Sequence, residues 1–520
     1  MTEQPVDLIS LSDRLTELEK RLNVVAKYGT QIKGDLDVLK LQFNGRYELA
    51  QLEQLTNNLE QLSAQVDSLL NSQILPQEIQ EQNSLFTESE LQVLKFIFMF
   101  YMIAGVENKQ QKTSISREEF VKLFNDGSRN FRERNLKRIH LSRITFSNYA
   151  INFINANLTD ADLSNCNFVG DSNFTNANLT RADLTQTNLS NCILQGANLR
   201  NADLIKTKLV KANLTNANLK NANLSQADLT EADLTDVNLS YANLKEANLT
   251  NAKLINADIS NANLSSVLLV KSVLNYANLS NTTLKQAFLS GSKFRYADLS
   301  NADLTRANLI GKSDLLTNFT GANMTGTILH QAVYDDCTIF PDGINPSELG
   351  AYLITPKSSL QKADLSGFDL SNVDLTEADL TEANISDSTL TEADLTGANL
   401  TSANLENADL TNADLTEANL ENAHFKEANF KEANLTGVNL KNADLTGANL
   451  TGANLTGANL TGANLENADL TNADLTGANL ENANLKNADL TGANLEGAKL
   501  ENAHLEGAKL PENKEEVIDN

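Results

Sequence analysis

Apolar residues recur at every fifth position over most of this chain. In the stretch from Glu466 to Leu485, ENADLTNADLTGANLENANL, a leucine closes each group of five residues. An amphipathic helix repeats its apolar positions about every 3.6 residues, and a half-buried strand about every two. A strict period of five fits neither element. The pattern instead predicts a backbone that turns a corner once in every five residues.

Each repeat reads A-(D/N)-L-x-x, with a small residue two positions before the central leucine and polar residues elsewhere. Two of every five side chains therefore point inwards, one large and one small. Four repeats can close a square coil of twenty residues. The backbone N–H and C=O groups then pair with the coils above and below, as in a parallel sheet with strands about 4.8 Å apart. The pattern predicts an all-β solenoid, a quadrilateral β-helix with a leucine and phenylalanine core.

The five-residue frame covers residues 131–339 in a first part. It shifts by two residues before Phe153 and by one before Phe174, and then runs unbroken to Leu309. At the next central position stands Asp314, where we expect the coil to bulge. We place later centres of this part at Phe319, Met324, Leu329, Tyr334 and Ile339.

Residues 340–359, FPDGINPSELGAYLITPKSS, interrupt the frame and contain proline and glycine. They form either a kink between two β-helices or an insertion loop or short hinge, and we favour the loop or hinge. The frame resumes over residues 360–510 as a second, acidic β-helix. Residues 511–520 follow Pro511 as a polar tail.

The N-terminal part has a different periodicity. Residues 1–75 carry leucines at alternating steps of three and four, which predicts a coiled coil or a helical hairpin. The seams either close within one chain or form a homo-oligomer. Residues 76–130 predict a small helical unit, in which Ser116 and Glu119 open a short helix that runs through Phe124.

No segment has the length of a membrane span. The longest apolar stretch, Phe96–Val106, has eleven residues, so we interpret it as a buried core helix, with an interfacial helix as the weaker alternative. The acidic start lacks the basic and apolar regions of a secretory signal. Three widely spaced cysteines form no disulfide framework and fit a reducing compartment, so we expect a cytoplasmic protein.

The A-(D/N)-L-x-x array resembles the pentapeptide repeat family. The resemblance covers roughly residues 131–510 and implies a right-handed quadrilateral β-helix. The segment AVYDDCTIFPDGINP, Ala332 to Pro346, also resembles a recurring Y-D-x-x-T-x-F-P-x-G segment of such proteins, many of them cyanobacterial. The helical N-terminal extension resembles no family that we recognise.

No catalytic or cofactor motif is present in the sequence. Cys166, Cys192 and Cys337 stand two residues before a centre, where we expect small buried fillers. The four histidines fall on outward positions, and His424 and His504 lie four coils apart, which is too far for one metal ion. We therefore expect a protein that is not an enzyme and that uses no cofactor or metal.

Charge is distributed unevenly along the chain. The formal net charge is −26, which argues against direct binding of nucleic acid. Residues 174–309 contain 13 basic and 10 acidic residues, whereas residues 360–510 contain 7 basic and 25 acidic residues. Six basic residues between 128 and 143 are a local exception. They form either a binding patch for an anion or a partner, or a solvated, self-paired junction.

These features favour a scaffold that presents flat faces to a protein partner of basic character, with the helical N-terminus for oligomerisation or recruitment. The uneven charge has a second explanation, drift in a repetitive gene with solubility as its only consequence. With four repeats in a coil, residues twenty apart share a face, and acidic residues then gather on two adjacent faces of the second β-helix. The alternative, implied by the resemblance, is a DNA mimic that occupies the DNA site of a type II topoisomerase. The candidate partner-binding residues are Asp369, Asp374, Asp394, Asp409, Asp414, Asp469, Asp474 and Asp489.

Overall fold

The computed structural model describes residues 114–146, 150–168, 170–311 and 315–512. The expected coiled coil or hairpin of residues 1–75 and the apolar segment Phe96–Val106 lie outside these residues. Within the described ranges, no helix is both long enough and apolar enough to cross a bilayer.

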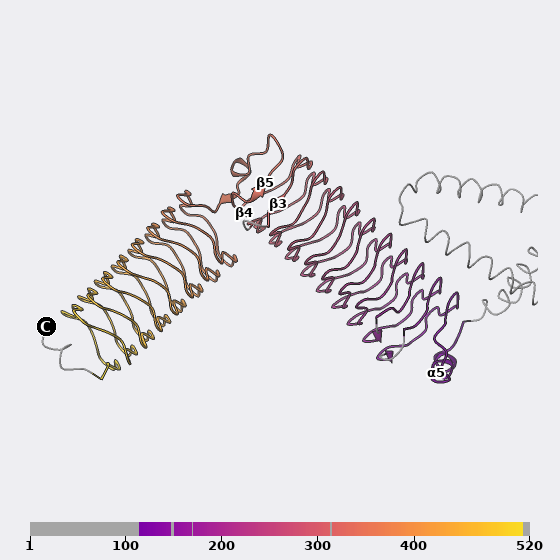
Figure 1. Ribbon diagram of the computed structural model, residues 1–520, viewed down its shortest axis with the longest axis horizontal. Coiled ribbons are helices and arrows are strands. Elements are labelled where there is room, and N and C mark those ends of the chain that lie inside the picture. The colour runs from indigo at the N-terminus through magenta and orange to yellow at the C-terminus, as the bar shows by residue number, and fades with distance from the viewer. Residues whose placement is uncertain (1–113, 147–149, 169, 312–314, 513–520) are drawn as a thin grey trace, which may run out of the picture. The chain divides into compact units, whose positions relative to one another are not determined.

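The described chain is a β-helical solenoid of stacked four-sided coils (Figure 1). Asp374 forms a parallel bridge with Asp394, which bridges Asp414, so one coil contains twenty residues. The amide N of Leu475 donates to the carbonyl O of Asn494 in the next coil at 2.8 Å, and the amide N of Asp474 donates to Ala453 O in the previous coil at 2.9 Å. These ladders of hydrogen bonds provide partners for backbone N–H and C=O groups of each repeat. The prediction of four repeats per coil is confirmed.

The corners of the coils require a left-handed backbone. The residue two positions after each centre has a positive φ in nearly every described repeat, for example 59° at Asn472 and 57° at Glu417. Asparagine and glycine adopt this conformation most readily, which explains their frequency at this position. The central leucines and the small residues two positions before them are buried almost completely.

Three irregularities in register match the interruptions of the sequence frame. Strand β1 (Thr145–Phe146) pairs with β2 (Asn167–Phe168) at a separation of 22 residues, and Asn152 bridges Asn173 at 21. From Asn173 the separation is 20 residues, until Lys293 bridges Asn318 at 25. This separation is a whole number of repeats, so the frame is kept, whereas Asp314, where we expect the coil to bulge, lies outside the described residues.

Helix α5 (Arg117–Asn125) closes the N-terminal end of the first stack of coils (Figure 1). Its N-cap is Ser116, whose hydroxyl accepts a hydrogen bond from the amide N of Glu119 at 3.2 Å. The expected short helix is therefore confirmed. The Phe120 ring is buried and stacks on Phe131 with centroids 4.3 Å apart, which covers the open end of the core.

The position of the last centre in the first part, Ile339, was predicted wrongly. Strand β5 (Thr338–Ile339) pairs with β3 (Thr317–Asn318), so Thr338 takes the inward small-residue site above Thr317. The centre is then Phe340, which stacks on Phe319 with centroids 5.6 Å apart. One extra residue between Tyr334 and Phe340 produces this slip.

The hydrophobic core is divided into two clusters near residue 333. Strand β4 (Val333–Tyr334) pairs with β6 (Tyr352–Leu353), and its successive side chains point to opposite sides. Val333 is fully buried in the second core, whereas Tyr334 packs against the first. The 3-10 helix η1 (Ser347–Leu349) lies within the connection, and Ile354 opens the second core. We call the coils before and after this connection the first and second β-helix.

Candidate functional site

The eight predicted aspartates lie in two columns on neighbouring faces of the second β-helix. We call the repeats centred on Leu375, Leu395, Leu415, Leu435, Leu455, Leu475 and Leu495 the Asp374 face. On this face, parallel backbone bridges connect one outward residue of each coil to the next. These residues are Asp374, Asp394, Asp414, Asn434, Asn454 and Asp474. The preceding repeats form the Asp369 face, whose column contains Asp369, Asp409, Asp469 and Asp489. The expected face-sharing is confirmed, while a role in partner binding stays a prediction.

Each of these aspartates has a local structural task. One carboxylate oxygen, Oδ1 of Asp374, accepts the amide N–H of Thr376 at 3.0 Å and its hydroxyl at 2.6 Å. Asp414 and Thr416 repeat this arrangement. The interaction stabilises the corner that follows the centre, and an asparagine Oδ1 serves equally well. The negative charge, however, is not needed for this task.

Exposure differs along the Asp374 column. Asp374 and Asp394 are exposed, and Asp414 is half-buried. Burial raises the pKa of Asp414, but hydrogen bonds from Thr416 and Asn434 outweigh it, so the pKa lies below the ordinary carboxyl value. Carboxylates in successive coils lie about one strand spacing, roughly 4.8 Å, apart. Such stacking of like charges is unfavourable without a counter-charge.

Six of the seven lysines between residues 360 and 510 pair with carboxylates, all on the other three faces. Lys441 lies 3.4 Å from Glu421, and Lys426 lies 3.9 Å from Glu406, each one coil away. On the Asp369 face, Lys509 Nζ lies 2.7 Å from Asp489 Oδ2 and holds the pKa of that carboxyl at about 2. Between 374 and 497 the Asp374 face itself carries seven acidic residues and no basic one: Asp374, Glu377, Asp394, Asp414, Glu417, Asp474 and Glu496. Lys357, at its upstream end, pairs with Glu377 at 3.3 Å.

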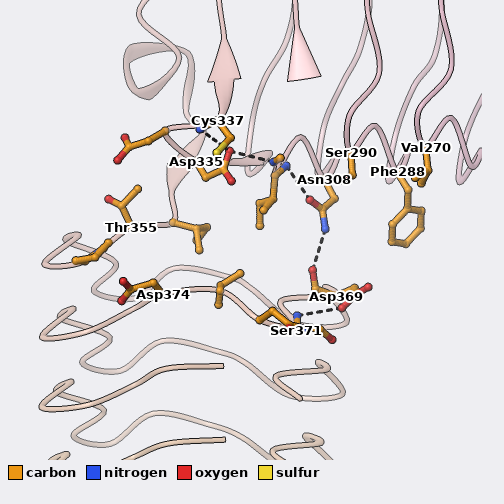
Figure 2. Close-up of a pocket in the computed structure, with 17 residues that line it drawn as sticks. Val270, Phe288, Ser290, Asn308, Asp335, Cys337, Thr355, Asp369, Ser371 and Asp374 are labelled. Carbon is orange, nitrogen blue, oxygen red and sulfur yellow. Dashed lines mark hydrogen bonds between the residues drawn. The ribbon is translucent and has the colours of Figure 1, made fainter. Parts of the chain in front are cut away.

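A pocket of about 490 Å³ lies where the second β-helix begins, and we call it the junction cleft. Figure 2 shows Val270, Phe288 and Asn308 on coils of the first β-helix, and Asp369 and Asp374 on the facing coil of the second. The Asn308 amide donates to the carbonyl O of Asp369 at 2.9 Å across it. Two of the predicted aspartates thus line this cleft.

The cysteines differ in environment. Cys166 and Cys192 are buried, as expected, and burial raises their pKa to about 11 and about 12. The expectation is wrong for Cys337, which is partly exposed and lines the junction cleft. The slip that moves the centre to Phe340 places Thr338 at the inward site in its stead.

The histidines provide no metal centre in the part of the chain that the structure describes. His424 and His504 lie in one column, but residues of three intervening coils stand between them. No group of three or more His, Cys, Asp or Glu side chains with metal-binding geometry occurs among the described residues.

The basic cluster after α5 contains several internal contacts. The Arg129 guanidinium donates to the carbonyl O of Phe124 at 2.6 Å and lies over its ring, at the C-terminal end of α5. Arg132 pairs with Glu133 at 3.0 Å, and Arg138 lies 3.7 Å from Asp160. These contacts support the self-paired interpretation of the cluster.

Sequence reasoning missed the junction cleft. Its signal was present in the repeat pattern, because the position before a centre is normally Asp or Asn, whereas Leu268 and Phe288 occupy it in successive coils of one column. A search for apolar residues at outward positions would have indicated this apolar wall among others, but not the second wall that closes the cleft.

Comparisons with known proteins identify the repeats. A model of the family described as "Pentapeptide repeats (8 copies)" matches residues 151–269, 272–310 and 358–507 in overlapping segments, which is more than half of the chain. No curated protein matches the chain significantly.

Solved structures similar to this chain include two pentapeptide repeat proteins, HetL and Rfr23, and the resistance protein QnrB1. HetL from the cyanobacterium Nostoc sp. strain PCC 7120, involved in heterocyst differentiation regulation, is 25% identical over 76% of this chain and 98% of HetL, with a TM-score of 0.16. QnrB1, a plasmid-mediated fluoroquinolone resistance protein, is 17% identical over 49% of this chain and 97% of its own, with a TM-score of 0.20. Rfr23 from the cyanobacterium Cyanothece 51142 is 42% identical over 22% of this chain and 63% of its own, with a TM-score of 0.12.

The family assignment rests on the repeat matches, which coincide with the two stacks of coils. The chain belongs to the pentapeptide repeat family.

Proposed function

We propose that this protein is a non-enzymatic interaction scaffold whose Asp374 face binds a basic protein partner. The observation that carries the proposal is the column of Asp374, Asp394 and Asp414 in successive coils, on a face that carries no basic residue of its own between 374 and 497. A partner that supplies lysine or arginine side chains at this spacing relieves the repulsion between the stacked carboxylates.

The shape of this face supports the same proposal. The residues after its centres are threonines in six successive coils from Thr376 to Thr476, and the corner residues include Gly437, Gly457 and Gly477. Short side chains on a rigid backbone leave a flat surface. Few flexible side chains of the scaffold are then immobilised when a partner binds, so the entropic cost of binding is small.

The DNA-mimic alternative has less support. Lysines offset only part of the negative charge on the other three faces of the second β-helix, where seven basic residues stand against 18 acidic ones, so these faces do not by themselves count against a duplex mimic. The first β-helix, with 13 basic and 10 acidic residues between 174 and 309, is nearly neutral.

The proposal is tested with a fluorescent decalysine peptide as the probe. A variant with Asp374→Asn, Asp394→Asn and Asp414→Asn keeps the corner hydrogen bonds and should bind the probe about tenfold more weakly at low salt. The control variant Asp298→Asn, Asp379→Asn and Asp444→Asn removes the same charge from other faces and should bind nearly as well as the natural protein. Equal loss in both variants would reduce the effect to net charge and refute a dedicated face.

A further inference from the structure

The junction cleft has one wall that breaks the repeat rule. Phe288 lines the cleft from an outward position that normally carries Asp or Asn, and the column continues with Asn308. Leu268, one coil earlier in the same column, is also apolar but lies outside the cleft lining. Val270 and Ile310 stand beside this column, two residues after Leu268 and Asn308. Leu268 is 37% exposed. Single apolar residues at outward positions also occur elsewhere, as at Ile328, but Phe288, Val270 and Ile310 gather at one hollow, and such a gathering is typical of an interaction surface.

The opposite wall shows a second departure from the pattern. Phe368 and Val373 stand two residues before their centres, at sites usually held by alanine. They belong to the first complete coil of the second β-helix, and both line hollows at the junction. Phe288 lines the cleft of about 490 Å³ and the adjacent hollow of about 230 Å³. The Phe368 and Val373 side chains belong to the second core and are only 6% and 8% exposed, so each contributes a small apolar edge to its hollow.

The charge of the cleft has a single sign. Asp335, Asp336, Asp369 and Asp374 line it, and the other described lining residues include no lysine, arginine or histidine. Asp335 is engaged by the amide N–H groups of Gly311 and Cys337 at 3.0 and 3.1 Å. Asp369 and Asp374 each accept hydrogen bonds through Oδ1, from Ser371 and Thr376. Their negative charge remains at the edge of an apolar hollow, together with that of Asp336, and attraction for a cation is stronger there than in open water.

Polar contacts fix the two walls relative to each other. The Arg306 guanidinium donates to Asp364 Oδ2 at 2.6 Å and lies 5.1 Å from the centroid of the Phe368 ring. Asn308 donates to Asp369 O at 2.9 Å. A cleft held in this way is pre-formed, which lowers the entropic cost of filling it.

We propose that the junction cleft binds a segment of a partner protein that inserts an apolar side chain next to a lysine or arginine. This inference rests on the proposed function as an interaction scaffold and adds a second, sequence-selective contact to the charged face. The volume falls within the range of small ligand pockets, which accommodates a few side chains and no folded domain. The apolar side chain contacts Phe288 and Val373, and the cation contacts Asp369 and Asp374.

The test is selection of random short peptides, displayed on phage, against the immobilised full-length protein. Enriched peptides are synthesised, and their dissociation constants are measured with the natural protein and with four variants. Phe288→Asn restores the usual residue of its column, and its control, Val273→Asn, makes the same kind of change on another face. Asp374→Asn has as its control Asp394→Asn, one coil further along the same column.

The inference predicts peptides that combine an apolar residue with lysine or arginine. Their affinity should fall about tenfold or more in Phe288→Asn and several-fold in Asp374→Asn, and stay within about twofold in both controls. Partial protection of Cys337 from a thiol reagent by the same peptides places them in the cleft. Peptides that bind all variants equally would overturn the inference. So would a selection in which the natural protein enriches peptides no more strongly than the Phe288→Asn variant does.

The two proposals fail separately in this experiment. Loss of binding in Asp394→Asn equal to that in Asp374→Asn supports the charged face and contradicts the cleft. Selective loss in Phe288→Asn, with decalysine binding unchanged by the three Asp→Asn substitutions of the Asp374 face, supports the cleft and contradicts the proposed function.

Discussion

At the scale of the residue, two polar positions of the repeat stabilise the coil, although their polarity alone would suggest only exposure to solvent. The Asp or Asn before each centre accepts hydrogen bonds from the second residue after it, as in Asp474 and Thr476. The corner residue adopts a positive φ even where it is glutamate, as in Glu417. Buried positions were predictable because leucine and alanine differ chemically from the rest. The corner was less visible, because lysine and glutamate occur there beside glycine and asparagine.

The corner conformation can be tested at Gly477. Its φ is 66°, and an added Cβ would meet no atom within 4 Å, so a substitution there changes backbone strain without a clash. We expect Gly477→Val to lower the free energy of unfolding by about 1–2 kcal/mol. Gly477→Asn should be nearly neutral, since asparagine tolerates this region. Urea denaturation measures both, and an equal loss in the two variants would contradict the explanation.

Cysteine environments give a second test at this scale. In the native protein we expect a thiol reagent to modify Cys337 and to leave Cys166 and Cys192 unreacted, because burial limits access and raises their pKa. Cys166→Ala and Cys192→Ala should retain the fold, since alanine is the usual residue at this site. Mass spectrometry of the modified peptides measures the reaction. Early modification of Cys192 would show that its coil opens more readily than the described packing allows.

At the scale of the element, the coil was predictable and the connection between the cores was not. Counting by twenty places Asp374, Asp394 and Asp414 on one face, because every repeat contributes one side of the square. Around Phe340 the count fails. Ile339 and Phe340 are both apolar, so the sequence could not indicate which residue is the centre, whereas the pairing of β5 with β3 selects Phe340.

The pairing of Asp489 with Lys509 predicts how the last coils respond to pH. The pKa of Asp489 is about 2 in the folded protein, below the ordinary aspartate value of about 3.9. Its contribution to stability is therefore complete above about pH 4 and is lost as the pH falls through about 2.

Hydrogen exchange of the C-terminal coils, corrected for intrinsic rates, measures this effect. Lys509→Gln should exchange faster than the natural protein at pH 6, and the difference should diminish strongly as the pH falls towards about 2. The control Lys362→Gln, whose lysine pairs with Glu382 in the first coils of the second β-helix, should leave the C-terminal rates unchanged. A difference at pH 2 as large as that at pH 6 would assign the protection to something other than this ion pair.

At the scale of the whole molecule, the division of the core has consequences for unfolding. Val333 and Tyr334 face different cores, so the two clusters meet without merging. In a solenoid each coil is stabilised mainly by its neighbours, so cooperativity weakens where stacking is interrupted. We expect the two β-helices to unfold in separate transitions.

Leu475→Lys tests this division. Leu475 is fully buried, and its loss removes about 1.5–3 kcal/mol of apolar burial and buries a charge without a partner. Exchange-detected denaturation should show a lower midpoint for residues 360–510 and an unchanged one for residues 174–309. The control Asn479→Lys, at an outward position whose column carries Lys499 one coil later, should change neither midpoint. A single transition that shifts as a whole would contradict two separate cores.

The candidate site was predictable only in part. The acidic columns follow from the repeat and the charge pattern. The junction cleft depends on contacts between residues about sixty positions apart, such as Arg306 with Asp364 and Asn308 with Asp369. No periodicity fixes the approach of two stacks of coils, so the cleft required the structure.

The central claim is that the Asp374 face of this scaffold binds a basic protein. The most direct measurement compares proteins captured at low salt from the cells that make it. The baits are the intact protein, the variant with Asp374→Asn, Asp394→Asn and Asp414→Asn, and the variant with Asp298→Asn, Asp379→Asn and Asp444→Asn. The account predicts a basic protein that the intact bait and the second variant retain, that the first variant loses, and that salt releases. The claim would be contradicted if all three baits captured the same basic proteins, or if no bait captured a basic protein.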